Sequence, residues 1–289
     1  MAMKNKANNK PRTRELKPFE ELTITDDFMF GAVMSDPKRC KRLLEEILNI
    51  KIRRIEYPER QKYIDLKYDA KSIRLDIYVE DEKNTVYDIE MQTTSKGYLP
   101  LRMRYYQDMI DLNIINKGQN YKHLKQSFVI FLCTFDPFGK DRYKYLFKHI
   151  CVDDYDVVLE DKAIPIILNC TGHVGEISDD LKDFLNYMAG QEPKGDFVQD
   201  VAKGVDEIRK DEVWRRDYMT LAMKIQEEKE VDILADRIAA IKVGRNNVDN
   251  EMLMNMFHLD EDQLNEILSL LDQYPNKDEW EIAEMILYK

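Results

Sequence analysis

Two acidic side chains flank a short charged turn near the middle of the chain, and their spacing places them close together. Asp76 and Glu90 both lie in the stretch 73–92, where polar and apolar residues alternate on either side of the turn 81–84. Such alternation predicts an antiparallel hairpin, in which successive side chains point to opposite faces. A turn of two to four residues brings Asp76 to within about one position of lying opposite Glu90.

The two convergent carboxylates predict a bound cation. Like charges on one sheet face repel each other unless a cation lies between them. Carboxylate oxygens are ligands of hard ions such as Mg²⁺, which keeps its other positions for water and phosphate. The same residues leave a second interpretation open, in which Asp76 and Glu90 belong to the solvated outer face of a half-exposed hairpin.

The hairpin resembles the PD-(D/E)xK nuclease superfamily and, more narrowly, the recombination-promoting nuclease and transposase family. The resemblance is carried by RLDI at 74–77 and IEMQ at 89–92. Three further segments agree with it in the same order: TDDFMF at 25–30, LPLRMRYYQDMID at 99–111 and FVIFLCTFDPFG at 128–139. The match extends over about the first 170 residues, with weaker agreement around 214–223.

The resemblance implies an α/β fold with a restriction-endonuclease-like core, a mixed central sheet flanked by helices. Apolar residues at helical spacing from Ser178 onward add an all-helical C-terminal region. We therefore expect a disordered basic arm over 1–17, a nuclease-like core over 18–172 and an acidic helical region over 173–289.

Several elements are predicted from local signals in the sequence. Capping residues and apolar spacing predict helices that start near Thr25 and Ser35, and a third over about 101–117. The continuous apolar run 127–134 predicts a strand covered on both faces. Further strands are expected at 143–151 and 164–169, and one long charged helix from about 197 to 242.

The mechanism that the resemblance implies is metal-assisted hydrolysis. Asp76 and one oxygen of Glu90 would bind Mg²⁺ or Mn²⁺, with the backbone carbonyl of Met91 as a further ligand, and the metal would activate a water for in-line attack on phosphate. The third catalytic position of the family is usually lysine, and here it is Gln92. An amide orients water and donates a hydrogen bond but supplies no charge.

Four further residues are candidates for accessory roles at this site. Arg104 or Lys96 would provide the missing cation. Asp27 is the candidate for the acid that a first helix commonly adds to such sites, and plain helix capping is an equal alternative for it. Tyr106 would stack on bases or hydrogen-bond to phosphate.

The net charge of −11 at first argues against a nucleic-acid enzyme, because DNA binding draws its affinity from Lys and Arg. The charge is unevenly distributed. Residues 1–150 hold 29 Lys and Arg against 22 Asp and Glu, whereas residues 151–289 hold 15 against 33. The half that carries Asp76 and Glu90 is therefore mildly basic, which is compatible with DNA as the partner.

The composition predicts a cytoplasmic protein. No apolar run approaches the ~20 residues that a membrane helix needs, and the basic N-terminus lacks the apolar segment of a secretory signal. The four cysteines are widely scattered and include no CxxC pair, so we expect reduced thiols.

We therefore predict a Mg²⁺-dependent DNA endonuclease, a phosphodiester hydrolase associated with recombination or mobile elements, whose catalytic residues are Asp76, Glu90 and Gln92. The alternative is a non-catalytic remnant, or a protein-interaction module with a degenerate nuclease core. Gln92 and the acidic bulk of the chain favour this alternative. The long charged helix further predicts a homodimer through the C-terminal helices.

Overall fold

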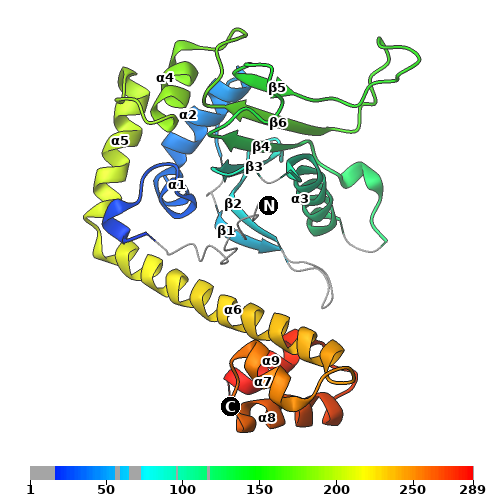
Figure 1. Cartoon of the computed structure of the whole chain (residues 1–289). Coiled ribbons are helices and arrows are strands. Elements are labelled where there is room, and N and C mark those ends of the chain that lie inside the picture. Colours follow the sequence, from blue (N-terminus) through cyan, green and yellow to red (C-terminus); the bar gives the residue numbers. More distant parts are fainter. Residues whose placement is uncertain (1–16, 56–58, 65–72, 96, 116–117, 289) are drawn as a thin grey trace, which may run out of the picture. The chain divides into compact units, whose positions relative to one another are not determined.

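The computed structural model describes residues 17–55, 59–64, 73–95, 97–115 and 118–288. The chain divides into two compact units, 1–215 and 216–289. The first unit contains the β-sheet with its flanking helices, and the second is helical (Figure 1). The predicted disordered arm lies, except for Lys17, outside the described residues.

The described strands of the first unit form one mixed sheet in the order β1-β2-β3-β4-β6-β5 (Figure 1). Strands β1, β2 and β3 pair antiparallel, β3, β4 and β6 pair parallel, and β5 pairs antiparallel with β6. The strand bounds are β1 Glu59–Ile64, β2 Ile73–Glu80, β3 Val86–Gln92, β4 Ser127–Cys133, β5 Lys144–Leu146 and β6 Ala163–Asn169. The predicted mixed sheet flanked by helices is confirmed.

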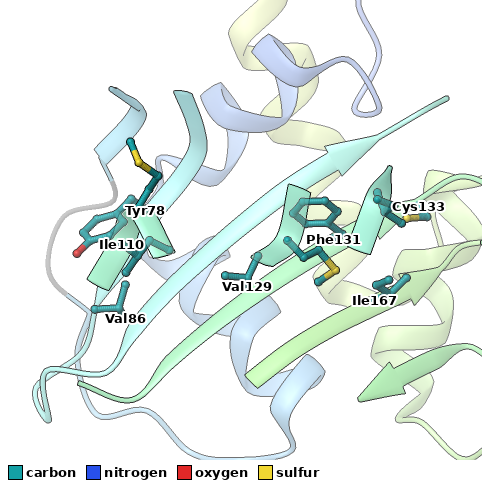
Figure 2. Close-up of a cluster of buried hydrophobic side chains, with 10 residues drawn as sticks. Tyr78, Val86, Ile110, Val129, Phe131, Cys133 and Ile167 are labelled. Atoms are coloured by element: carbon teal, nitrogen blue, oxygen red, sulfur yellow. The ribbon is translucent and has the colours of Figure 1, made fainter. Parts of the chain in front are cut away.

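One face of the sheet is covered by helix α3, Leu99–Ile114, which connects β3 to the parallel strand β4. The sheet contributes Tyr78, Val86, Val129, Phe131 and Ile167 to the shared core (Figure 2). The helix contributes its buried apolar side chains, which are Leu99, Met103, Met109 and Ile110. Because helices cover both of its faces, β4 can be the continuous apolar run that the sequence shows.

The opposite face is covered by α1, Asp27–Met34, and α2, Pro37–Leu48 (Figure 1). Helix α2 starts as its sequence predicts. The Asp36 carboxylate accepts hydrogen bonds from the backbone N–H groups of Lys38 and Arg39, and Pro37 occupies the first turn. The helix ends at Asn49, whose backbone is left-handed with φ of 52°.

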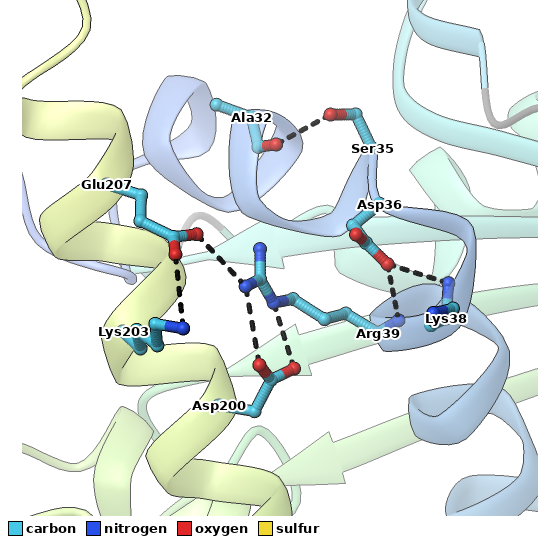
Figure 3. A network of polar contacts seen from close by, with 8 residues as sticks. All are labelled: Ala32, Ser35, Asp36, Lys38, Arg39, Asp200, Lys203 and Glu207. Atoms are coloured by element: carbon cyan, nitrogen blue, oxygen red, sulfur yellow. Dashed lines mark hydrogen bonds and ion pairs between the residues drawn. The ribbon is translucent and has the colours of Figure 1, made fainter.

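Helices α4, Asp179–Met188, and α5, Gly195–Arg209, pack beside α1 and α2 in the first unit. Arg39 of α2 ties α5 in place by ion pairs to Asp200 at 3.0 Å and Glu207 at 3.2 Å (Figure 3). A Cβ atom at Gly204 of α5 would lie 2.7 Å from the Arg39 Nη1 atom, so a side chain there would displace the flexible end of Arg39.

The predicted long helix over 197–242 is two helices, α5 and α6, Glu212–Gly244. The Asp211 carboxylate accepts a hydrogen bond from the Val213 N–H at 2.7 Å and thereby begins a new helix. The strand predicted at 143–151 is also shorter than expected, because only Lys144–Leu146 pairs in the sheet.

The second unit is built from the rest of α6 with α7, Asn250–Phe257, α8, Glu261–Gln273, and α9, Glu279–Leu287. Its own core consists of apolar side chains from these helices, including Val231, Ile238, Ile241, Leu253, Leu264, Ile267, Leu271 and Ile282. Asp249, Asp260 and Asp278 cap the three shorter helices. The all-helical C-terminal region is confirmed, and no described helix is long and apolar enough to span a membrane.

Candidate active site

Asp76 and Glu90 lie side by side on the sheet face that α3 covers. In the β2–β3 pair, Ile77 is opposite Ile89 and Tyr78 is opposite Asp88, so the next position places Asp76 opposite Glu90. The Asp76 N–H donates to Glu90 Oε1 at 2.8 Å, and the Met91 N–H donates to Asp76 Oδ2 at 3.0 Å. Each carboxylate is thus held by a backbone N–H of the other's strand.

Both carboxylates are buried, with 6% of Asp76 and 3% of Glu90 exposed. The alternative interpretation of a solvated outer hairpin face is therefore wrong. Burial of an acidic pair costs free energy unless hydrogen bonds and opposite charge compensate it. That cost is expected at a functional site rather than in a sheet built only for stability.

A third acid, Asp88, belongs to the same face and was not among the predicted site residues. It is fully buried, and neither of its carboxyl oxygens accepts a hydrogen bond from a donor among the described residues. The signal was present in the sequence, since Asp88 precedes Glu90 by two positions and must share its face.

The three acids cannot all be ionised in this surrounding without a cation. Burial, together with the charge of Asp76, raises the pKa of Asp88 well above its ordinary value. Burial and the charges of Asp76 and Asp88 likewise raise the pKa of Glu90. The cluster therefore takes up protons or binds positive charge.

Arg102, in the first turn of α3, supplies one positive charge to the cluster. Its Nη2 atom lies 3.9 Å from Glu90 Oε2 and donates to the Tyr106 hydroxyl at 2.9 Å. Its Nη1 atom donates to Gln92 Oε1 at 2.6 Å. Burial and the nearby Glu90 charge raise the pKa of Tyr106 to about 12, so its hydroxyl stays protonated.

Of the predicted accessory residues that the structure describes, only Tyr106 lies in the acid cluster. Arg104 is exposed on α3, and Lys96 lies outside the described residues. Asp27 is exposed at the first position of α1, on the other side of the sheet from α3 (Figure 1). Arg102 was missed as the cation, although its spacing of one helical turn from Tyr106 was visible in the sequence.

The donor set fits a divalent cation held partly by substrate and water. Among the described residues, no three His, Cys, Asp or Glu side chains are arranged to hold a metal ion. Mg²⁺ commonly takes only one or two protein carboxylates and completes its shell with water and phosphate. Asp76 and Glu90 could provide that pair, and the carboxyl oxygens of Asp88 beside them have no hydrogen-bond partner among the described residues.

The comparison with protein families gives one match. The family model of the PD-(D/E)XK nuclease family transposases matches residues 25–171, just over half of the chain. The chain belongs to this family. The matched residues contain the whole described sheet, α1 to α3 and the acids Asp76, Asp88 and Glu90, so the restriction-endonuclease-like fold and the nuclease or transposase relationship are confirmed.

Neither the curated proteins nor the solved structures gave a match to the chain. The roles of Asp76, Glu90, Met91 and Gln92 stay predictions, now with a defined geometry.

Proposed function

We propose that this family member is a divalent-metal-dependent DNA endonuclease that hydrolyses phosphodiester bonds during recombination or the movement of mobile elements. The observation that carries the proposal is the pair Asp76 and Glu90, each held by a backbone N–H from the opposite strand at 2.8 or 3.0 Å. A third buried acid and one arginine stand beside this pair. An arrangement so unfavourable for folding alone has its best explanation in catalysis.

In the proposed reaction, Asp76, Glu90 and the backbone carbonyl of Met91 would hold Mg²⁺ or Mn²⁺. When bound, the ion would supply Lewis-acid polarisation of phosphate and a water of lowered pKa. Gln92, at the end of β3, orients that water or donates a hydrogen bond to a phosphate oxygen. Helix α3 closes one side of the site and keeps bulk water away from the carboxylates, which strengthens their interactions.

We further propose a cytoplasmic location, with a nuclease core that ends near residue 172 and self-association through the C-terminal helices. Analytical ultracentrifugation tests the last of these. A monomer at all concentrations would exclude the homodimer and would leave the cleavage proposal intact.

The decisive experiment is nicking of supercoiled plasmid by the purified full-length chain with Mg²⁺, with Mn²⁺ and with EDTA. Asp76→Ala removes one proposed ligand, and we expect its rate to fall by at least roughly 10²-fold. Asp153→Ala is the matched control, because Asp153 is an exposed aspartate far along the chain from the site. Equal nicking by the Asp76→Ala and unsubstituted proteins would refute the proposed function.

The rival function, a non-catalytic protein-interaction module, is favoured by Gln92, which stands where the family usually has a charged lysine, and by the net charge of −11. Calorimetric titration with Mg²⁺ and Mn²⁺ separates the two. Absence of binding of both ions, together with capture of a protein partner by the C-terminal region, would establish the rival.

A further inference from the structure

The side-chain amide of Gln92 has only one chemically permitted orientation. Arg102 Nη1 lies 2.6 Å from Gln92 Oε1. A guanidinium group has five N–H donors and no acceptor, so the atom facing it must be the amide oxygen. The Nε2 group of Gln92, which carries two donors, is therefore turned away from Arg102.

Arg102 is itself held firmly. The Tyr106 hydroxyl accepts from Nη2 at 2.9 Å, and the guanidinium lies 5.4 Å from the ring centre of Tyr106 and 5.5 Å from that of Phe131. Contacts of this kind between a cation and aromatic faces are attractive. The positive charge is thereby kept 3.9 Å from Glu90 Oε2, inside the acid cluster.

We propose that Arg102 is a positioning residue that, together with Gln92, replaces the lysine usual at this point of the site. The charge of Arg102 offsets the carboxylates. Its hydrogen bond fixes the Gln92 amide so that Nε2 donates to a phosphate oxygen or to the attacking water. This inference rests on the proposed phosphodiester hydrolysis. It assigns to Arg102 the positive charge that Gln92 cannot supply.

Arg102 would thus offset the carboxylate charge and also hold the Gln92 amide. Removing its charge should therefore change the Mg²⁺ affinity and the cleavage rate in opposite directions. A cation beside Glu90 competes with Mg²⁺ for the carboxylates, so its loss strengthens metal binding. The same loss frees the Gln92 amide and slows cleavage. A residue that only supported the fold would weaken metal binding and cleavage together.

The experiment compares Arg102→Gln, Arg102→Lys and Arg237→Gln in the full-length chain. Arg237 is an exposed arginine of α6 in unit 216–289, which makes it the matched comparison. Plasmid nicking at saturating Mg²⁺ gives the turnover rate, and calorimetry with Mg²⁺ on the metal-free protein gives the affinity. Circular dichroism confirms that each variant is folded.

For Arg102→Gln we expect turnover to fall roughly 10²-fold, the usual effect of losing one preorganised donor at a reacting phosphate or carbonyl. We expect Mg²⁺ to bind at least roughly threefold more tightly, because a competing charge is gone. Arg102→Lys keeps the charge but loses the planar fork, so it should slow turnover without changing Mg²⁺ affinity. Arg237→Gln should change neither the turnover rate nor the Mg²⁺ affinity.

A double variant, Gln92→Lys with Arg102→Gln, returns the charge to strand β3. It should cleave at least roughly tenfold faster than Arg102→Gln alone, since an ammonium supplies both charge and donors. The inference is overturned if the double variant is no faster, or if Mg²⁺ binds Arg102→Gln no more tightly than the unsubstituted protein.

The outcomes also separate this inference from the proposed function. If the unsubstituted protein cleaves DNA and Arg102→Gln cleaves equally well, only the inference fails. If the unsubstituted protein does not cleave at all, the proposed function fails, and the Mg²⁺ affinities alone decide the role of Arg102. If Arg102→Gln does not fold, Arg102→Lys tests the inference instead. Its turnover should be slower while its Mg²⁺ affinity is unchanged.

Discussion

At the scale of single residues, Asp76, Asp88 and Glu90 share one face of the sheet, because strand side chains alternate between its two faces. Whether that face is buried depends on α3, which is brought over it by a crossover between β3 and β4. Asp88 and Arg102 joined the site only once this tertiary contact was known.

Asp88→Asn should stabilise the metal-free protein at neutral pH. The change keeps the side-chain volume, removes a buried group whose oxygens accept no hydrogen bond, and adds donors toward Glu90. A buried polar group without partners costs about 1–3 kcal/mol, so the free energy of unfolding should rise by a similar amount. Urea denaturation in EDTA measures it.

Asp108→Asn serves as the control for this prediction, because Asp108 is exposed on α3. It should leave the free energy of unfolding within about 0.5 kcal/mol of its original value. A loss of stability in Asp88→Asn would show instead that the Asp88 carboxylate is an acceptor needed by the fold.

At the scale of elements, the sequence was informative wherever a local signal was strong. Asp36 and Pro37 marked the start of α2, and the apolar run marked β4, because capping and burial on both faces each leave a distinct pattern. The break between α5 and α6 was missed because neither proline nor glycine interrupts the chain at 210–211. Asp211, as the cap of a new helix, was the available signal.

The loop after β6 depends on a glycine for a close approach between backbones. A Cβ atom at Gly172 would lie 2.6 Å from the carbonyl oxygen of Arg142 and 2.7 Å from the backbone nitrogen of Tyr143. The loop also forms the hydrogen bonds from Tyr143 N–H to Val174 O and from Asn169 N–H to Tyr143 O. Backbone atoms cannot rotate away as a side chain can.

Gly172→Ala should therefore lower the free energy of unfolding of the first unit by about 1–3 kcal/mol, the usual cost of overpacking. Gly97→Ala is the matched control, since no atom lies within 4 Å of a Cβ atom there and its φ is not positive. Thermal denaturation of both variants measures the difference. An unchanged midpoint in Gly172→Ala would mean that the loop can move apart without cost.

At the scale of the whole molecule, the distribution of charge is less simple than a basic and an acidic half. Unit 216–289 holds 8 Lys and Arg against 17 Asp and Glu, and unit 1–215 holds 36 against 38. The basic excess of residues 1–150 is thus offset within the same unit by residues 151–215. The proposed binding of DNA would therefore have to draw on local basic surface, and its affinity should fall steeply as the salt concentration rises.

The separate cores of the two units predict two unfolding transitions. Ile267→Ala creates a cavity in the core of unit 216–289, where Ile267 is 2% exposed, and should destabilise that unit by about 2–5 kcal/mol. Calorimetry of Ile267→Ala should show a lower midpoint temperature for the transition of unit 216–289 and an unchanged midpoint for the transition of unit 1–215. Ile130→Ala, in the buried strand β4, should lower the other transition.

A shift of both transitions by Ile267→Ala alone would show that the two units unfold as one cooperative body.

The reciprocal bonds between β2 and β3 also decide where the gene can tolerate insertions. One codon added within 77–80 would turn Asp76 to the α1 side of the sheet and leave Glu90 behind, because strand side chains alternate. One codon added in the turn at 82–84 would lengthen the loop and leave the pairing of the two carboxylates untouched. A one-residue insertion should therefore disrupt the site when it falls in a strand of this hairpin and be tolerated when it falls in the turn.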